Sequence, residues 1–536
     1  MSHPVAPSVL LIGPYDPHCG EFTFLAPPLG VWRLAGVLES RGVRAKVFDP
    51  NCCIGPPQRA LERELKEGAW DIVGVSTTGM TLRFDLELAH LVRRVAPGTL
   101  LLAGGMEATF RPELMFELGP FDLVILGEGE RPLQEVVARR LQGASLEDVP
   151  GTAHRTAAGT IASRPQRALT RAELRDSIFS IPYARMPYAA YWERLERAYA
   201  LDSLPSKAAR EAQLAEIRSV RLITLNYCPM GCTFCSATNF LHAAQGSVAS
   251  IARLDAAECL VMLERIVRAH PQVRTVIFQD DIFTFTADQR VLPLCTGILE
   301  AKQRGTLPAS LQFISTNRID AMTPERLRAM RAAGFRVLGF GIESFAPRVL
   351  AEFNKAAIHR HIEPALSEAL RLGITPFLDL ILSSPQASLE DVALTLREAY
   401  RWLLAGCEIG MYPYVIPFSG ARFAADPQLL PFTRYEQRQV RGTQIRWPQA
   451  AKILPQDPKV AALILRLERD FERTLQGLEG QARHLPSRLR SLLWILCAMP
   501  LLEEHGHQIA DPAEVRAQVF ARLPRLLPEA ALAANA

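Results

Sequence analysis

The sequence has few cysteines for its length and almost no net charge. Only 10 of its 536 residues are cysteine, a density too low for a scaffold held together by disulfide bonds. The 60 Lys and Arg residues nearly balance the 56 Asp and Glu residues, which leaves a formal net charge of +4. Because no block of basic residues stands out either, we expect no nucleic-acid partner.

Long apolar segments are also absent. Residues 492–502 form the longest run worth testing, but a bilayer requires roughly 20 apolar residues, and Pro500 interrupts the run. The first residues lack the basic stretch and the cleavage site of a signal peptide. We therefore expect a cytoplasmic chain with reduced thiols and no membrane span.

What the sequence does contain is the composition of a large globular protein. Hydrophobic residues make up 49% and charged residues 22%, as in folded domains. The length suggests two to four domains. Changes in pattern divide the chain into segments at 1–142, 143–217, 218–428 and 429–536.

Short apolar runs alternate with amphipathic stretches in the first segment. Strands are predicted at 9–12, 43–48, 72–76, 100–103 and 123–126, with helices at 29–41, 86–94 and 132–141. This alternation predicts an α/β domain with a doubly wound, Rossmann-like parallel sheet.

The remaining segments differ from one another in pattern. Residues 143–217 carry many turn signals and predict a linker that packs against its neighbours. The next segment contains six strand–helix units, which predict a (β/α)6-type partial TIM barrel. From about residue 430 the pattern is wholly helical. We expect this C-terminal helical domain to cover a cleft between the two α/β domains. The six barrel strands are predicted at 221–225, 275–278, 311–315, 337–341, 375–381 and 409–415.

Three cysteines stand close together after the first predicted barrel strand. Cys228, Cys232 and Cys235 have the spacing C-x3-C-x2-C, and Gly231 lets the backbone fold around a shared centre. Three thiolates hold an iron–sulfur cube with one iron left open, whereas a structural zinc ion is usually closed by four protein ligands. The spacing predicts a 4Fe–4S cluster. A zinc site with a distant fourth ligand and unrelated cysteines are the alternatives.

This segment resembles the signature of the radical S-adenosylmethionine (SAM) superfamily, including the aromatic Phe234 before the last cysteine. In that family the open iron binds SAM, and electron transfer cleaves SAM to a 5′-deoxyadenosyl radical that abstracts hydrogen from a substrate. The resemblance implies a contact of Phe234 with the cofactor. It also implies an electron donor such as a flavodoxin or ferredoxin.

The resemblance continues in order along residues 220–425. Gln279, Asp280 and Asp281 stand where the family places polar groups that receive the SAM ammonium. Glu343, in a Gly-Ile-Glu-Ser element, resembles the residue that accepts from the SAM ribose. The pair Asn354-Lys355 commonly follows in the family.

Of two turns near the ends of later barrel strands, one resembles that family and the other departs from it. Residues 417–420 resemble a turn that follows the last barrel strand. Residues 383–386, Ser-Ser-Pro-Gln, replace the glycine-rich turn that many relatives carry after the fifth strand. The replacement removes the usual basis for a backbone contact to SAM at this turn.

Glycines follow several strands of the first domain, at the edge where open α/β sheets bind cofactors. Together with residues 71–78 they closely resemble the cobalamin-binding domain that precedes many radical SAM barrels, over residues 8–140. A Rossmann-like domain without a ligand is the alternative, and no G-x-G-x-x-G motif indicates a dinucleotide. The resemblance implies that the pocket for the nucleotide tail is lined by Ser76, Thr77, Gly104, Gly105, Gly127, Glu128, Gly129 and Glu130.

One loop histidine needs separate consideration. The segment from Asp16 to Gly20 is similar, with a different glycine spacing, to the loop in which cobalamin methyltransferases carry a histidine lower ligand. His18 could ligate cobalt through a neutral ring nitrogen. A polar surface histidine is the commoner case, and radical SAM relatives often bind cobalamin without a protein histidine.

Two cofactors acting on one substrate predict methyl transfer to an unactivated carbon of a small molecule or natural-product intermediate. The substrate is expected between the two α/β domains, and no catalytic residue is predicted. Tyr412 and Tyr414, on the last barrel strand, either face the substrate or fill the barrel. The alternatives are a non-methylating rearrangement, cyclisation or oxygen insertion with the same cofactors, and a non-catalytic iron–sulfur or scaffold protein.

Overall fold

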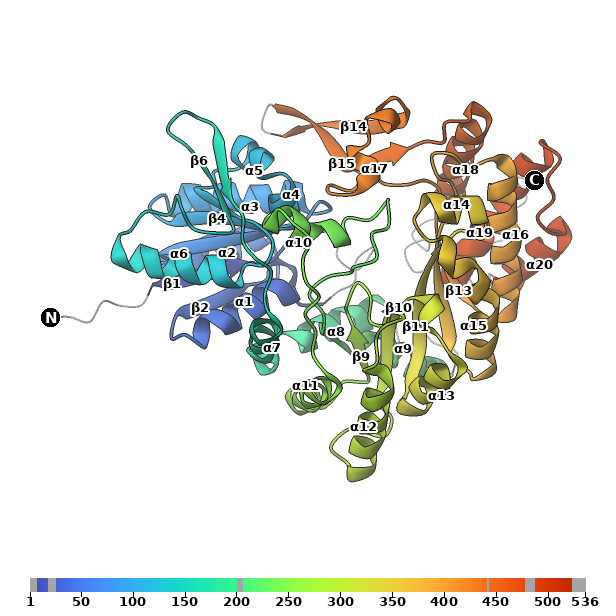
Figure 1. Ribbon diagram of the computed structural model, residues 1–536, viewed down its shortest axis with the longest axis horizontal. Helices are drawn as coiled ribbons and strands as arrows, with labels where there is room; N and C mark the ends of the chain where they lie inside the picture. Colours follow the sequence, from blue (N-terminus) through green and yellow to red (C-terminus); the bar gives the residue numbers. More distant parts are fainter. Residues whose placement is uncertain (1–6, 18–25, 200–205, 441–442, 478–486, 523–536) are drawn as a thin grey trace.

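The computed structural model describes residues 7–17, 26–199, 206–440, 443–477 and 487–522. Two α/β lobes lie side by side, and the C-terminal part of the chain packs on the second lobe (Figure 1). Within the described ranges, no helix has the length and hydropathy needed to cross a bilayer.

The first lobe is built on a seven-stranded sheet with the order β2-β1-β3-β4-β5-β6-β7. The first five strands in the chain are parallel, and the last two add an antiparallel edge. The strands are β1 (Ser8–Ile12), β2 (Arg44–Phe48), β3 (Ile72–Thr77), β4 (Leu100–Gly105), β5 (Leu123–Ile125), β6 (Thr152–Arg155) and β7 (Ile161–Arg164).

Helices cover both faces of this sheet, which is why its central strands are apolar on both sides. On one face lie α1 (Leu29–Glu39) and α6 (Glu130–Gln142). On the other lie α2 (Pro57–Gly68), α3 (Leu82–Val95) and α5 (Pro112–Leu118). The short α4 (Met106–Phe110) starts directly at the end of β4. The predicted doubly wound sheet is confirmed.

The segment between the lobes contributes to both of them. β6 and β7 extend the first sheet, whereas the helices that follow share the hydrophobic core of the second lobe. These helices are α7 (Arg171–Phe179), α8 (Tyr188–Ala198) and α9 (Lys207–Ile217).

The second lobe is an open barrel of six parallel strands in the order β13-β12-β11-β10-β9-β8, as predicted. The strands are β8 (Ser219–Leu222), β9 (Thr275–Phe278), β10 (Gln312–Asn317), β11 (Phe335–Glu343), β12 (Thr375–Ile381) and β13 (Glu408–Tyr412). Around and between them lie α10 (Ala237–Gln245), α11 (Ala256–Ala269), α12 (Val291–Arg304), α13 (Pro324–Ala333), α14 (Pro347–Glu352), α15 (His359–Arg371), α16 (Leu389–Ala405) and α17 (Arg422–Ala425).

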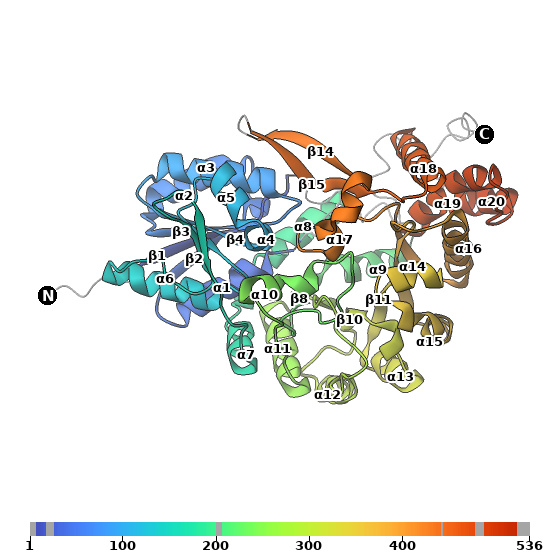
Figure 2. The same cartoon turned by 45° about the horizontal axis from the view of Figure 1, so that its top comes forward.

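The prediction of a wholly helical C-terminal region is wrong at its start. β14 (Thr433–Val440) and β15 (Thr443–Ile453) form an antiparallel hairpin, which reaches from the barrel toward the first lobe (Figure 1, Figure 2). The two strands form backbone hydrogen bonds with each other. They therefore form without the alternation of apolar and polar residues that would have identified strands in the sequence.

The helices after the hairpin also differ from their expected place. α19 (Ser487–Glu503) contacts β13 and α16, and it is flanked by α18 (Pro458–Gly477) and α20 (Pro512–Arg522). These helices therefore cover the barrel beside its last strand, on the side away from the first lobe (Figure 1). The expectation that they cover a cleft between the lobes is wrong, because α19 packs on β13 and α16 while α18 and α20 pack on α19.

Candidate active site between the two lobes

A cavity of about 340 Å³ lies between the two lobes, at the carboxyl ends of strands from both sheets. Open parallel sheets bind ligands at this edge, and the volume falls within the range of small-molecule pockets. The first lobe lines the cavity with residues at or just after the ends of β3, β4 and β5, and the second lobe with residues that follow β8 and β9. The lining includes Ser76, Gly104, Gly105, Gly127, Glu128, Gly129, Glu130, Gln279, Asp280 and Asp281.

The glycines at the end of β4 expose backbone to this cavity. Gly105 has φ +96°, and a Cβ placed on it would lie 2.5 Å from the backbone oxygen of Thr77. A Cβ on Gly104 would meet only Ile125, at 3.8 Å. The space in front of Gly104 is therefore free, and a ligand can approach the backbone there.

Thr77 has a structural role, unlike the other predicted residues of this edge. Its hydroxyl donates to the carbonyl of Gly104 (2.9 Å) and accepts from the amide of Ala108 (3.2 Å). The side chain is fully buried and is not part of the cavity lining. Thr77 thus holds the turn from β4 into α4 in place.

Glu128 and Glu130 bind the segment that joins the lobes. Glu128 accepts from the amide of Leu169 (2.7 Å), and Glu130 accepts from the hydroxyl of Ser177 (2.7 Å) and pairs with Arg33 (2.5 Å). Burial and the neighbouring Glu130 raise the pKa of Glu128 to about 7. One buried carboxylate oxygen of each residue has no hydrogen-bond partner among the described residues, which leaves an unused acceptor beside the cavity.

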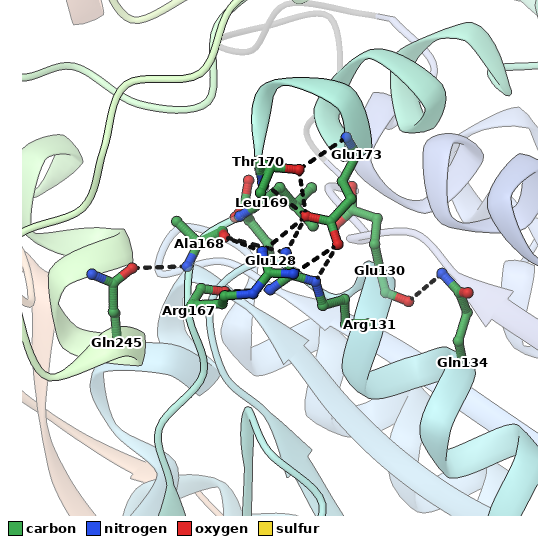
Figure 3. A network of polar contacts seen from close by, with 10 residues as sticks. All are labelled: Glu128, Glu130, Arg131, Gln134, Arg167, Ala168, Leu169, Thr170, Glu173 and Gln245. Carbon is green, nitrogen blue, oxygen red and sulfur yellow. Dashed lines mark hydrogen bonds and ion pairs between the residues drawn. The ribbon is translucent and has the colours of Figure 1, made fainter.

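A polar network next to these glutamates connects three parts of the chain (Figure 3). Glu173 caps α7 through Thr170 and pairs with both Arg131 and Arg167. The amide of Ala168 donates to the side chain of Gln245, at the end of α10 (2.8 Å). The network therefore fixes the joining segment to the first lobe and to the helix that follows the cysteine loop.

The three cysteines of the predicted cluster lie on a loop that its neighbours shape closely. Gly231 adopts φ +66°, and its amide donates to the hydroxyl of Thr238 (2.9 Å), which donates to the carbonyl of Cys228 (2.8 Å). The amide of Ala237 donates to Sγ of Cys235 (3.4 Å). Hydrogen bonds to sulfur are typical of thiolates that bind iron–sulfur clusters.

Burial favours the protonated form of the three thiols, so a bound metal must deprotonate them before they act as ligands. Burial raises the pKa of Cys228 to about 12 and that of Cys235 to about 11, and it also raises the pKa of Cys232. Coordination to a metal deprotonates such a thiol. The irons of a cube bind separate thiolates, and this loop offers three thiols from one short segment. The loop therefore fits a cluster.

The pair Asn354-Lys355 forms hydrogen bonds with both the cysteine loop and Glu343. The sequence did not reveal these contacts. Asn354, itself at φ +60°, donates to the carbonyl of Gly231 (3.0 Å) in the cysteine loop. Lys355 donates to Glu343 (2.7 Å) and to the carbonyl of Gly341 (2.7 Å). Although burial alone would lower the pKa of Lys355, the carboxylate of Glu343 raises it above its ordinary value, so the ammonium stays charged.

Glu343 is held in an unusual backbone conformation. Its φ is +64°, and the pairing of β11 with β12 shifts register between Gly341 and Glu343. A non-glycine residue in this region is strained, and such strain persists where surrounding contacts hold it. The bulge and Lys355 together fix the carboxylate at the carboxyl end of the barrel.

The three residues after β9 separate into two roles. Asp280 is buried and accepts from the amides of Thr224 (2.6 Å) and Leu225 (2.9 Å). Burial raises its pKa to about 6, and Arg290 offsets part of that effect. Asp280 therefore holds the end of β8 in place, whereas Gln279 and Asp281 are exposed to the cavity.

Phe234 lies beside the barrel rather than in the cavity lining. Its ring packs edge-on against Phe353 at 5.0 Å, and the Lys355 ammonium lies 5.6 Å from its centroid. The turn at residues 383–386 is tied to Glu352, which accepts from the hydroxyl of Ser384 and the amide of Gln386.

Of the two tyrosines predicted on the last barrel strand, Tyr412 ends β13, whereas Tyr414 lies beyond it, so that prediction is wrong for Tyr414. Tyr414 donates to Glu468 of α18 (2.6 Å) and is a structural contact. Tyr412 is 53% exposed. His18, the possible cobalt ligand, lies outside the described residues.

Comparisons with known proteins agree with this architecture. Residues 17–137 match the family model of the B12 binding domain, and residues 222–399 match that of the radical SAM superfamily. The uncharacterized methyltransferase PH0819 of Pyrococcus horikoshii is 24% identical over 403 residues, which are 74% of this chain and 77% of the relative.

Two solved structures share the fold at low sequence identity. The cobalamin-dependent SAM radical enzyme OxsB, with aqua-cobalamin bound, aligns with 97% of this chain and 75% of its own at a TM-score of 0.69 and 15% identity. The radical SAM methyltransferase TsrM of Kitasatospora setae, with cobalamin and a 4Fe–4S cluster bound, aligns with 80% of this chain and 81% of its own at a TM-score of 0.61 and 16% identity. The chain, with a B12 binding domain ahead of a radical SAM domain, therefore belongs to the cobalamin-dependent radical SAM enzymes.

Proposed function

We propose that the protein is a methyltransferase that adds a methyl group to an unactivated carbon of a small molecule or natural-product intermediate. The observation that carries the proposal is the cavity shared by the glycine-rich strand ends of the first lobe and by Gln279 and Asp281 of the second. A relative that matches 74% of the chain is named a methyltransferase, which supports methylation.

The residues of the second lobe suit a cluster and SAM. Cys228, Cys232 and Cys235 would hold a 4Fe–4S cluster with one iron open. Gln279 and Asp281 would receive the SAM ammonium, and Glu343 the ribose. With these groups and cobalamin bound, the site has a source of 5′-deoxyadenosyl radical and a methyl carrier, supplied with electrons by a protein such as a flavodoxin or ferredoxin.

The first lobe would hold cobalamin through backbone rather than through charged side chains. Ser76, Gly104, Gly105, Gly127 and Gly129 would cradle the nucleotide tail, with the free oxygens of Glu128 and Glu130 as acceptors for amide groups. The protein's own contribution is orientation, because both cofactors must meet one substrate in a fixed geometry. Apolar side chains of the lining exclude water there, among them Leu29, Leu133, Leu225 and Phe240.

A labelled methyl group tests this proposal directly. The protein is reconstituted anaerobically with iron, sulfide and cobalamin, and is then supplied with a reductant and SAM that carries a trideuterated methyl group. We expect 5′-deoxyadenosine in solution and the label in the extracted cobalamin, both measured by mass spectrometry. Cobalamin without label, despite 5′-deoxyadenosine formation, would contradict methyl transfer and favour a non-methylating enzyme.

Two cysteine variants serve as test and control. Cys235→Ala should lose iron, sulfide and SAM cleavage together. Cys497→Ala, a half-buried thiol of α19 near Thr474, should keep all three. Retained SAM cleavage in Cys235→Ala would contradict its role as a cluster ligand.

A further inference from the structure

Asp379 is a carboxylate inside the barrel, apart from the cysteine loop and the turn after β9. It lies on β12, whose side chains alternate between two faces. Leu378 and Leu380 are fully buried in the core between the barrel and its helices. Asp379 therefore points to the opposite side, the interior of the barrel.

The strands on both sides of Asp379 carry glycine in register with it. Gly341 of β11 and Gly410 of β13 are its direct partners across the sheet. A Cβ on Gly341 would lie 2.6 Å from Oε1 of Glu343, and one on Gly410 would lie 3.2 Å from Oδ1 of Asp379. The two glycines therefore make room for the carboxylates of Glu343 and Asp379 themselves, which a larger residue at either position would displace.

Asp379 differs from Glu343 and Asp280, its fellow carboxylates at this end of the barrel, because it is unpaired. Glu343 has Lys355, and Asp280 has two backbone amides. Among the described residues, no hydrogen bond or ion pair involves the carboxylate of Asp379. An unpaired carboxylate in a half-buried position costs free energy unless a ligand provides the partner.

The charges that face Asp379 favour a positively charged partner. Glu343 and Lys355 neutralise each other, Tyr412 of β13 is neutral, and more distant Arg490 acts on Tyr412. Burial and the carboxylate of Glu343 raise the pKa of Asp379 to about 7, while Lys355 acts in the opposite direction. A cation beside Asp379 would stabilise its ionised form.

We propose that Asp379 binds an ammonium group of the substrate, so that the substrate is an amine whose carbon chain lies beside Glu343 and the SAM site. This inference rests on the proposed function, because it assumes a radical formed at that site. The competing partner of Asp379 is SAM itself, which the test below distinguishes.

Deuterium transfer from a small probe tests the proposal without knowledge of the natural substrate. The reconstituted holoenzyme is incubated with SAM, dithionite and perdeuterated butylammonium, or with perdeuterated 1-butanol or butyrate as neutral and anionic probes. When the radical abstracts deuterium, a C–D bond of the probe breaks and a C–D bond forms at the 5′ carbon of deoxyadenosine. The carbon radical left on the probe combines with a sulfur dioxide radical anion from dithionite, which forms a C–S bond and leaves an alkyl sulfinate.

We expect a higher fraction of monodeuterated 5′-deoxyadenosine with butylammonium than with either of the other probes. Asp379→Asn should lower that fraction about tenfold, the effect of losing one charge-assisted hydrogen bond. Asp148→Asn, at an exposed position in the first lobe, should leave the fraction unchanged.

Three results would overturn the proposal. One is an equal deuterium fraction from all three probes, including a fraction of zero. Another is a fraction in Asp379→Asn equal to that of the native chain. The third is a weakened SAM dissociation constant in Asp379→Asn, measured by calorimetry, with the deuterium fraction unchanged, because it would assign the carboxylate to SAM. If the native chain forms no 5′-deoxyadenosine, the proposed function itself fails, and this inference fails with it.

Discussion

At the scale of single residues, Lys355 determines whether Glu343 is available to a ligand. Its ammonium is buried between the Glu343 carboxylate, the Gly341 carbonyl and the ring of Phe234. Without it, Glu343 would be a buried carboxylate without its ion-pair partner, on a strained backbone. Lys355 thus connects the end of β11 to the cysteine loop, because its neighbour Asn354 donates a hydrogen bond to that loop.

Lys355→Met should therefore lower both stability and SAM affinity. Removal of one partner from a buried ion pair costs about 3 kcal/mol, measurable by denaturant unfolding. We expect SAM to bind about tenfold more weakly in calorimetry, which corresponds to about 1.4 kcal/mol. The double variant Glu343→Gln/Lys355→Met should regain stability but not SAM affinity. Full recovery of SAM affinity in the double variant would contradict the role of Glu343.

Asp379 should reduce the stability of the free protein. Its pKa is about 7 in the folded chain against an ordinary 3.8, so the folded state is destabilised as pH rises from about 4 to about 7. Asp379→Asn should raise Tm by about 2–4 °C at pH 8, as a gain of ~1 kcal/mol does in a domain of this size, and much less at pH 4.5. Asp148→Asn should change Tm little at either pH. An unchanged Tm for Asp379→Asn at pH 8 would show that its carboxylate is not destabilised by burial.

Sequence patterns predicted the cluster loop and the glycine edges but not which side chains support them. The cysteine spacing and the glycines are local features, so the sequence displays them. By contrast, the engagement of Thr77 and Asp280 by backbone groups depends on neighbouring strands, as does the pairing of Glu343 with Lys355. Asp379 gave no signal in the sequence, because its importance comes from glycines on two other strands.

At the scale of elements, the joining segment 143–217 is the part whose role the sequence understated. Two of its strands complete the first sheet, and its helices complete the core of the second lobe. The network around Glu173 fixes it at the point where both lobes meet (Figure 3). The relative position of the two cofactor sites therefore depends on this segment.

Glu173→Ala tests that dependence. It removes the capping box of α7 and the pairs with Arg131 and Arg167 together. We expect a loss of about 1–2 kcal/mol of unfolding free energy, mainly from the cap, in a denaturant titration. Glu62→Ala, which removes an exposed pair with Lys66, should cost less than about 0.5 kcal/mol. Equal effects of the two changes would contradict a special role for the network.

The C-terminal region shows where helical patterns mislead. The helices α18 and α19 formed as expected, but β14 and β15 depend on their mutual pairing. Which side of the barrel the helices cover was equally undetermined, because an apolar helix face does not identify its partner. Only the three-dimensional packing on β13 and α16 settles it.

At the scale of the whole molecule, two α/β lobes present the same kind of edge to one cavity. Each lobe ends its parallel strands there, so backbone groups and polar loop residues of both sheets converge. This arrangement suits the proposed function, in which one lobe would hold a ligand through glycines and the other through cysteines and a few carboxylates.

Gly104→Val should abolish cobalamin binding by the first lobe and leave the cluster in the second lobe unchanged. A Cβ at this position meets only Ile125 within the fold, so the domain should tolerate the change while the added methyl groups enter the cavity. We expect the purified protein to lose bound cobalamin, measured by absorbance after gel filtration, and to keep its iron and sulfide. Gly98→Ala, a site with free space around it, should keep both. Retention of cobalamin by Gly104→Val would place the ligand elsewhere.

Electron paramagnetic resonance (EPR) gives the most direct test that the cluster and cobalamin face one cavity. In protein reconstituted with both groups, a reduced cluster close to cob(II)alamin should speed the electron spin relaxation of the cobalt, as measured by pulsed EPR. We predict faster relaxation in the native chain and the slow relaxation of isolated cob(II)alamin in Cys235→Ala. Cobalt relaxation that is the same with and without the reduced cluster would contradict the account that both groups face one cavity.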